Sequence, residues 1–257
     1  MCNSSLVAQR FEIGLTGGGS NFIGDVGPNN FHIPTGWYAG AFYRTNLNNY
    51  WSMRVSYNQG MVMADDANAN WAWRQNRNLN FVSEIQEVAL WFEFNFFEFI
   101  GRKKGSQSLY VFGGLGLFFF DPMTEFEGEM VRLQPLGTEG QGSSLTNEAP
   151  YSLADYILPF GIGWKLSVNK TITLGAEVGF RRTGTDFLDD VSGFYADPAL
   201  LAQQNGPVAA ALSDRSGDPR STNGQLRGNP NRDDWYIFSG ITLSFKLYSA
   251  REKCARF

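Results

Sequence analysis

Apolar and polar residues alternate with a period of two through the last long segment of the chain, and this alternation restricts the possible folds more than any other feature. Between Trp235 and Leu247 one parity is bulky and apolar except for Ser239, whereas the other parity mixes aromatic, small and polar residues. Successive side chains of a β-strand point to opposite faces of a sheet. The segment is therefore predicted to be a strand whose two faces meet different environments.

Eight segments of the chain show this alternation, and the connections between them alternate in length as well. The eight segments are 11–16, 37–44, 51–58, 87–96, 108–120, 156–166, 171–181 and 235–247. The short connections are 46–49, 98–107 and 168–170, and the long ones lie near 20–36, 59–83, 121–154 and 183–234. An even number of antiparallel strands joined in turn by short and long connections is typical of an outer-membrane barrel.

The fold class we expect is therefore all-β: an eight-stranded antiparallel transmembrane β-barrel of the outer-membrane type, with long external loops. The barrel and its loops would occupy residues 11–248. Residues 1–10 would form an N-terminal segment, interpreted as the remnant of a signal peptide, and residues 249–257 a basic periplasmic tail. Both termini of such a barrel are expected on the periplasmic side, in a protein integral to the outer membrane.

A soluble β-sandwich or a lipocalin-like barrel would also alternate, so the character of the second face decides between the two classes. In a soluble protein that face would meet water and be dense in Lys, Glu, Ser and Asn. Here it is rich in glycine and carries isolated charges, which suits a narrow enclosed lumen. We therefore expect the bulky, aromatic parity to face lipid.

Charged residues on the second parity would point into a lumen that eight strands leave only just wide enough for side chains. These residues are Glu12, Arg44, Arg54, Glu87, Glu93, Lys165, Glu177, Arg181 and Lys246. Charges in a confined space are costly unless they are paired, so four acids facing five bases predict a plug of salt bridges. A charge-selective pore would instead favour one sign.

The composition excludes several other functions. Lys and Arg total 21 against 25 Asp and Glu, giving a net charge of −4, whereas a nucleic-acid-binding protein normally has a basic stripe. The chain has one histidine, His32, and no G-x-S-x-G motif. We therefore expect no catalytic residues, no cofactor and no small-molecule substrate.

A group of carboxylates in the segment TDFLDDVSGFYAD is the one candidate for a metal site. Asp186, Asp189 and Asp190, followed by Asp197, supply the oxygen ligands that calcium prefers. Their spacing does not match the D-x-[DN]-x-[DN]-G calcium loop. A surface acidic turn, or a buried salt-bridge partner for Arg181 or Arg182, is therefore the favoured interpretation.

The expected periplasmic rim carries two cysteines and several basic residues. Cys2 and Cys254 would flank the same rim, because the first and last strands of a closed barrel are neighbours. An internal disulfide, a bond to a partner protein, a lipid-modified Cys2 and two free thiols all remain open. Arg102, Lys103 and Lys104 make the rim basic, either as solvated charge or as a dock for an acidic periplasmic partner.

Several longer stretches of the chain resemble the PorG-type barrel of the Bacteroidetes type IX secretion system. They are FEIGLTGGGSNFIGDVG (11–27), AGAFYRTNLNNYWSMRVSYNQG (39–60), LYVFGGLGLFFFDPM (109–123), VRLQPLGTEGQG (131–142), LPFGIGWKLSVNKTITLGAEVGFRRTGTDFLDDVSGFYADP (158–198) and RDDWYIFSGITLSFK (232–246). The EGQG and TDFLDDVS elements are the most specific of them.

The resemblance implies a non-enzymatic outer-membrane component of a protein-export machine. Such proteins associate with a periplasmic ring of the PorK lipoprotein and PorN, and in some organisms the machine supports gliding motility. Because a plugged barrel cannot conduct folded cargo, we expect this chain to anchor or position the ring. The alternative is a stand-alone small outer-membrane porin or adhesin.

Overall fold

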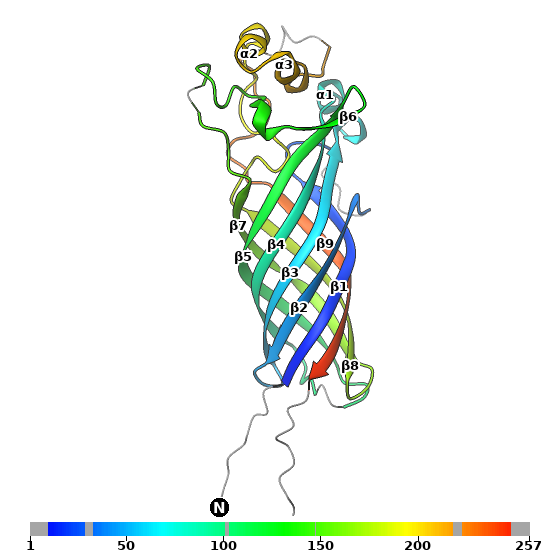
Figure 1. Ribbon diagram of the computed structural model, residues 1–257. Helices are drawn as coiled ribbons and strands as arrows, with labels where there is room; N and C mark the ends of the chain where they lie inside the picture. The colour runs from blue at the N-terminus through cyan, green and yellow to red at the C-terminus, as the bar shows by residue number, and fades with distance from the viewer. Residues whose placement is uncertain (1–9, 29–32, 101–102, 147, 218–222, 248–257) are drawn as a thin grey trace, which may run out of the picture.

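Eight long strands close into an antiparallel barrel in the computed structural model, which describes residues 10–28, 33–100, 103–146, 148–217 and 223–247. The wall consists of β1 (Arg10–Ile23), β2 (Gly36–Asn46), β3 (Trp51–Asp65), β4 (Asn80–Asn95), β5 (Gln107–Phe126), β7 (Ala154–Ser167), β8 (Ile172–Thr183) and β9 (Trp235–Leu247). Neighbours pair in the order β4–β3–β2–β1–β9–β8–β7–β5, and pairing of β4 with β5 closes the ring (Figure 1). The predicted eight-stranded barrel is confirmed.

A further short strand, β6 (Glu129–Arg132), lies outside the ring. It forms a hairpin with the end of β5, in which Phe126 pairs with Glu129. The two residues at the tip, Glu127 and Gly128, have φ values of 53° and 86°. A two-residue turn with both φ values positive matches the right-handed twist of the strands that it joins.

The wall has an apolar outer face and a charged inner face. Outward side chains such as Leu15, Ile162 and Ile241 are 59%, 63% and 70% exposed, whereas Arg44 and Glu93 on the inner face are buried. A soluble barrel would hold its bulky apolar residues inside and its charges outside. An apolar belt around a closed antiparallel ring requires hydrocarbon as its solvent. The protein is therefore a transmembrane barrel of the outer-membrane type, and the soluble alternative is wrong.

Glycines on the inner face make room for large lumen side chains. A Cβ atom added to Gly163 would lie 2.4 Å from Cζ of Tyr110, and one added to Gly14 would lie 2.3 Å from Cζ of Phe42. The abundance of glycine on the polar parity thus has a steric cause, since the aromatic rings of neighbouring strands occupy the space above it.

The strands extend further than the sequence predicts, and the long connections are correspondingly shorter. The first two span 24–35 and 66–79 instead of 20–36 and 59–83, and β5 continues to Phe126. The third long connection spans 127–153 and contains β6, and the fourth spans 184–234. Paired strands keep their hydrogen bonds beyond the apolar belt, where outward residues such as Asp65 and Glu84 no longer alternate with apolar ones.

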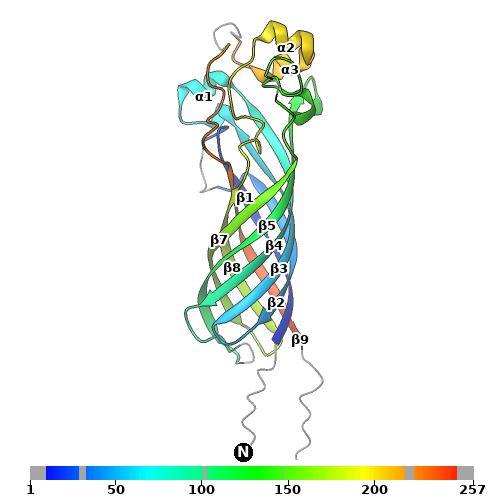
Figure 2. The ribbon, with the colours of Figure 1, turned by 90° about the vertical axis from the view of Figure 1, so that its left-hand side faces the viewer.

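The four long connections gather at one end of the barrel, which we call the long-loop end, and form a cap there (Figures 1 and 2). The cap contains η1 (Asp66–Asn68), α1 (Ala72–Arg77), η2 (Gln134–Leu136), α2 (Pro198–Gln204) and α3 (Pro207–Ser213). The opposite, short-turn end holds the three short connections, the start of β1 and the end of β9. Within the described residues no helix has the length and apolar character needed to cross a membrane.

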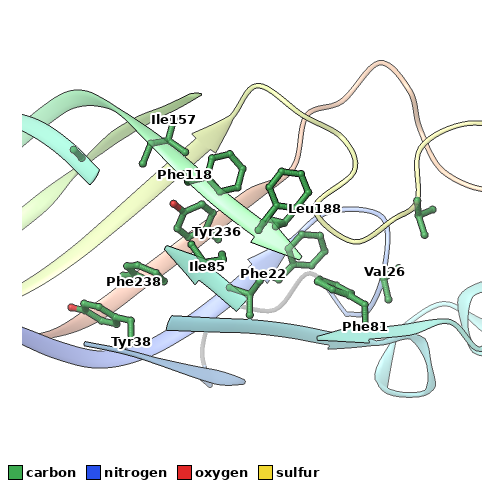
Figure 3. Close-up of a cluster of buried hydrophobic side chains, with 14 of the residues drawn as sticks. Phe22, Val26, Tyr38, Phe81, Ile85, Phe118, Ile157, Leu188, Tyr236 and Phe238 are labelled. Atoms are coloured by element: carbon green, nitrogen blue, oxygen red, sulfur yellow. The ribbon is translucent and has the colours of Figure 1, made fainter. Parts of the chain in front are cut away.

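Buried apolar side chains join the cap to the mouth of the barrel. Phe22, Ile85 and Phe118 point inward from the wall, and Leu188 from the last long connection packs among them with no exposed surface. Figure 3 shows this cluster, with Val26 of the first connection further out from the barrel. The cap is thus packed onto the barrel as part of one hydrophobic core.

Candidate functional site

The first part of the candidate site is a network of charges across the middle of the lumen. On β4, Oε2 of Glu93 lies 3.0 Å from Nε of Arg44 and 3.4 Å from Nζ of Lys165, and its Oε1 lies 3.3 Å from Nε of Arg54. Arg44 also lies 3.2 Å from Glu12. One carboxylate therefore holds three cations that come from three different strands.

Glu177 on β8 completes this network from the opposite wall. The two terminal guanidinium nitrogens of Arg54 on β3, Nη1 and Nη2, donate to its two carboxylate oxygens, in the bidentate geometry that fixes an arginine most firmly. The hydroxyl of Tyr110 donates to the same carboxylate. The contacts between β3 and β8 cross the lumen, because the two strands are not neighbours in the ring.

A second cluster lies nearer the cap around Glu87 on β4. Arg181 on β8 donates to both oxygens of Glu87 at 3.2 Å. Tyr236 and Asn58 donate to the same carboxylate at 2.6 Å each. The acid is fully buried, and four hydrogen bonds from three other strands replace the water that it loses.

Aromatic rings fill the space between the two clusters. The guanidinium carbon of Arg54 lies 4.7 Å from the ring centre of Trp91, and that of Arg181 lies 4.4 Å from the ring centre of Phe238. A cavity of about 10 Å³ remains between these groups, which is about the room that one water molecule needs. The described part of the lumen is therefore closed at mid-height.

The structure thus places all nine charged residues of the expected plug on the inner wall, and eight of them enter the two clusters. The ninth, Lys246, lies nearer the short-turn end, where its ammonium donates to Oγ of Ser167 at 2.9 Å. The sequence did not single out Tyr110 and Tyr236 as partners of these acids. Their place on the inward parity, among the polar residues, was the signal that could have found them.

Buried polar contacts also hold the cap together, and Arg77 at the end of α1 is the centre of one set. Its Nε lies 2.7 Å from Oδ2 of Asp66. Its other two nitrogens donate to the backbone carbonyls of Arg227 and Asp25, both at 2.6 Å. Asp66 in turn accepts from the backbone N–H of Gly27 at 2.9 Å. This one arginine therefore ties three of the long connections to one another.

The EGQG and TDFLDDVS elements meet in a second buried set. Glu139 accepts hydrogen bonds from the backbone N–H groups of Ser192 and Gly193, both at 2.9 Å, and pairs with Arg227 at 3.0 Å. Asp190 accepts from the hydroxyl of Tyr151 at 2.7 Å. These elements thus clamp the third long connection to the fourth.

Asp186, Asp189 and Asp190 do not converge on one point. Asp189 accepts from the backbone N–H groups of Val26 and Val191, both at 3.0 Å, while Asp190 pairs with Tyr151 and Thr138. In the part of the chain that the structure covers, no group of three or more His, Cys, Asp and Glu side chains is arranged to hold a metal ion. The calcium candidate therefore lacks a ligand set.

Of the two favoured alternatives for these aspartates, the surface turn is wrong, because Asp189 and Asp190 are buried. Asp190 is a buried salt-bridge partner, but its arginine is Arg227, at 3.6 Å, and not Arg181 or Arg182. Arg181 pairs with Glu87 across the lumen, and Arg182 pairs with Asp233 at 2.8 Å. Asp197, the fourth member of the segment, instead caps α2 by accepting from the backbone N–H groups of Ala199 and Leu200.

Burial raises the pKa values of several cap carboxyls, because the charged form loses its hydration. The pKa of Asp186 rises to about 8, helped by the neighbouring Asp189 and Asp25. Burial also raises the pKa of Asp234, whose Oδ2 accepts from the backbone N–H of Leu188. The pKa of Asp190 rises only to about 6, because Arg227 stabilises its charge.

At the short-turn end, Lys103 and Lys104 are exposed in the connection between β4 and β5. The other rim residues of interest, Cys2, Cys254 and Arg102, lie outside the described residues, as does His32. The basic rim is therefore represented in the structure by the two lysines.

A closed eight-stranded barrel with an apolar exterior and a charged, packed interior defines an outer-membrane β-barrel protein. Within this class, residues 1–199 match the family model described as a domain of unknown function (DUF6089), and the chain belongs to that family. No curated protein matches the chain.

Several solved structures are similar to this chain. The N-terminal barrel domain of Pseudomonas aeruginosa OprF has 10% identity and a TM-score of 0.41, with 93% of this chain and 97% of that chain covered. The attachment invasion locus protein Ail of Yersinia pestis has 10% identity and a TM-score of 0.44, with 93% and 99% covered. Neisserial surface protein A has 8% identity and a TM-score of 0.43, with 92% and 97% covered.

Proposed function

We propose that this protein is a non-enzymatic outer-membrane component of the type IX secretion machinery that anchors or positions a periplasmic ring of the PorK and PorN type. The closed lumen is the observation that carries the proposal. A chain that offers no passage to a folded protein acts through its surfaces, and the resemblance to PorG-type barrels supplies the identity of the partner.

The geometry of the lumen supports an anchor over a conduit. Glu177 holds Arg54 from the opposite wall, and Glu93 holds cations from three strands, so opening the lumen would leave several charges unpaired in a confined space. Breaking a buried pair by removing one partner costs about 3–5 kcal/mol. The lumen of an eight-stranded barrel is in any case only wide enough for side chains, so exported cargo would pass through another component of the machinery.

The short-turn end is the proposed docking side, placed in the periplasm. Short turns of outer-membrane barrels face the periplasm, and here they present Lys103 and Lys104 to solvent. An acidic surface on a ring protein would complement these charges and speed the encounter. The opposite end, under this proposal, presents the cap to the cell exterior.

Pull-down of the tagged protein from native membranes tests this proposal. We expect ring proteins with the wild type and reduced recovery with Lys103→Glu and Lys104→Glu combined. A matched control is Arg232→Glu, an exposed charge change on the cap, which should recover the ring unchanged. Recovery of the wild-type barrel without ring proteins would contradict the proposal.

Exposed aromatic residues on the cap favour one second candidate, a stand-alone adhesin. Trp71, the N-cap of α1, and Trp73, within α1, are 48% and 57% exposed, and tryptophan is enriched among residues that dominate binding interfaces. An adhesin would lose host-surface or matrix binding when both become serine, whereas the anchor would still recover the ring. A stand-alone porin, the other alternative, is not supported, because the described lumen is closed.

A further inference from the structure

The second long connection exposes only uncharged side chains around α1, which lies in the cap, beyond the barrel wall (Figures 1 and 2). From residue 67 to residue 78 the exposed residues are two tryptophans, four asparagines, one glutamine and two alanines. The charged residues of this stretch, Arg74 and Arg77, are buried. We call the exposed side chains of residues 67–78 the α1 surface.

The two tryptophan rings of the α1 surface rest on the buried arginines. The guanidinium carbon of Arg74 lies 5.1 Å from the ring centre of Trp71 and 5.2 Å from that of Trp73. The guanidinium carbon of Arg77 lies 5.3 Å from the ring centre of Trp73. These are cation–π distances, yet about half of each tryptophan remains exposed. Each ring is therefore supported from within the cap and open to solvent.

Both arginines are themselves fixed by the cap, so the rings are pre-organised. Arg74 donates to the backbone carbonyls of Gly27 and Gly24, and Arg77 pairs with Asp66. A ligand that stacks on rings already held in place loses less conformational entropy on binding than one that must order them.

Exposed amides beside the rings have unused hydrogen-bonding groups. Within the part of the chain that the structure describes, the side chains of Asn70 and Asn76 make no hydrogen bond. Each of these amides offers an acceptor oxygen and two N–H donors. The α1 surface thus combines flat aromatic faces with groups that both donate and accept.

We propose that the α1 surface binds a neutral carbohydrate. The C–H groups on one side of a sugar ring are slightly positive and fit the negative face of a tryptophan ring. Sugar hydroxyls donate and accept hydrogen bonds, as the amides of Asn70 and Asn76 do. Because residues 67–78 expose no charge, they offer no ion-pair partner to a phosphate, sulfate or carboxylate group.

A protein partner fits the α1 surface less well than a carbohydrate. An apolar protein surface would cover the amides of Asn70 and Asn76 and leave them without partners, which is unfavourable. A charged protein surface would find no opposite charge on residues 67–78. The inference is independent of the proposed secretion role, since the α1 surface lies at the end of the barrel opposite to the proposed docking side.

Binding of the purified full chain to an array of neutral and acidic glycans tests the proposal. The protein is kept in lauryldimethylamine oxide, because detergents with sugar headgroups would compete. Polysaccharide released from the producing cells is included, so that a ligand on the same cell is distinguished from one outside it. We expect binding to neutral glycans that depends little on salt concentration. Binding to no neutral glycan, or stronger binding to acidic glycans, would overturn the proposal.

Replacing the tryptophans provides the second arm of the experiment. Trp71→Ser combined with Trp73→Ser should lower the affinity for the bound glycan about tenfold or more, since tryptophans tend to dominate binding energies. The same pair changed to phenylalanine keeps aromatic faces and should lose much less affinity. Leu200→Ser removes an exposed apolar side chain from α2 and should bind as the wild type does. Unchanged affinity in the serine variant would overturn the proposal.

A third arm leaves both rings in place and removes the amides. Asn70→Ala combined with Asn76→Ala should lower the affinity several-fold, whereas Gln203→Ala, at an exposed position of α2, should not. Wild-type resistance of the cap to limited proteolysis shows that these variants fold. Unchanged affinity in the asparagine variant, or capture of a protein by a chain that binds no glycan, would overturn the proposal.

Discussion

Arg77 and Asp66 form a buried ion pair in the cap, with 2.7 Å between Nε and Oδ2. The same arginine donates hydrogen bonds to the backbone carbonyls of Asp25 and Arg227. A single side chain therefore holds together three of the long loops, which are far apart in the sequence. The cap is therefore an ordered structure whose integrity depends on a few buried polar groups.

Replacing Arg77 by leucine should open the cap without unfolding the barrel. The change leaves Asp66 buried without its charge partner, which costs about 3–5 kcal/mol. Limited proteolysis should then cut the long connections much faster than in the wild type, while the far-UV spectrum of the barrel stays the same.

Arg132→Leu is the matched control for Arg77→Leu. Arg132 forms an exposed pair with Asp121 at 2.7 Å, and exposed pairs contribute about 0–1 kcal/mol. Its proteolysis rate should match that of the wild type. Equal rates for Arg77→Leu and Arg132→Leu would show that the buried pair does not hold the cap.

Replacing Glu93 by glutamine should destabilise the barrel itself. Three cations, Arg44, Arg54 and Lys165, then lose the charge that they share, and we expect a loss of about 3–5 kcal/mol by the same reasoning. Urea unfolding in lipid vesicles measures the change. Glu84→Gln, at an exposed position of the same strand, should change the free energy of unfolding little, and a similar small effect for Glu93→Gln would refute the network.

Ile241→Arg tests which face of the wall meets lipid. Ile241 is the middle residue of β9 and is 70% exposed on the outer face, so an arginine there, near mid-bilayer, should cost about 2–4 kcal/mol. The free energy of unfolding from vesicles gives the result. Leu226→Arg, at an exposed position of the cap, should be neutral, and equal effects of the two changes would count against the assignment of the faces.

The cap should lose stability as the pH rises. The pKa of Asp186 is about 8 in the folded cap, against an ordinary value of 3.8. Between these two values the folded cap keeps a proton on Asp186 that the unfolded chain releases. The stability that this proton gives the cap is therefore complete below pH 4 and is lost as the pH rises toward 8. The loss is measured as the protection of the 184–193 backbone amides against hydrogen exchange, relative to their intrinsic exchange rates, at pH 5 and at pH 9.

Asp186→Asn should weaken this pH dependence, because the amide does not titrate, and leave the part that is due to Asp190 and Asp234. Glu129→Gln, an exposed change on the β5–β6 hairpin, should leave the dependence as it is in the wild type. An unchanged pH profile in Asp186→Asn would mean that another group is responsible.

The sequence was sufficient to predict the barrel because alternation is a local property. The segment from Trp235 to Leu247 became β9 with the expected bounds. The ends of β3 and β4 were missed because the hairpin that they form continues past the apolar belt, where Asp65 and Glu84 replace the outward apolar residues that produce the pattern.

The alternation of the sequence also predicted that the nine charged residues face the lumen, but it could not predict which of them pair with one another. The pairing of Arg54 with Glu177 joins residues 123 positions apart on strands that are not neighbours. It therefore depends on the register and closure of the whole ring. Contacts of the cap such as Glu139 with Arg227 link two irregular connections, which carry no periodicity from which their meeting could be inferred.

Planar-bilayer recording on the purified wild-type protein is the decisive measurement, because the proposed role depends on a lumen closed by paired charges. We expect no steady conductance above that of the bilayer at physiological salt. A steady, sizeable conductance would contradict the closed lumen and would favour a stand-alone porin.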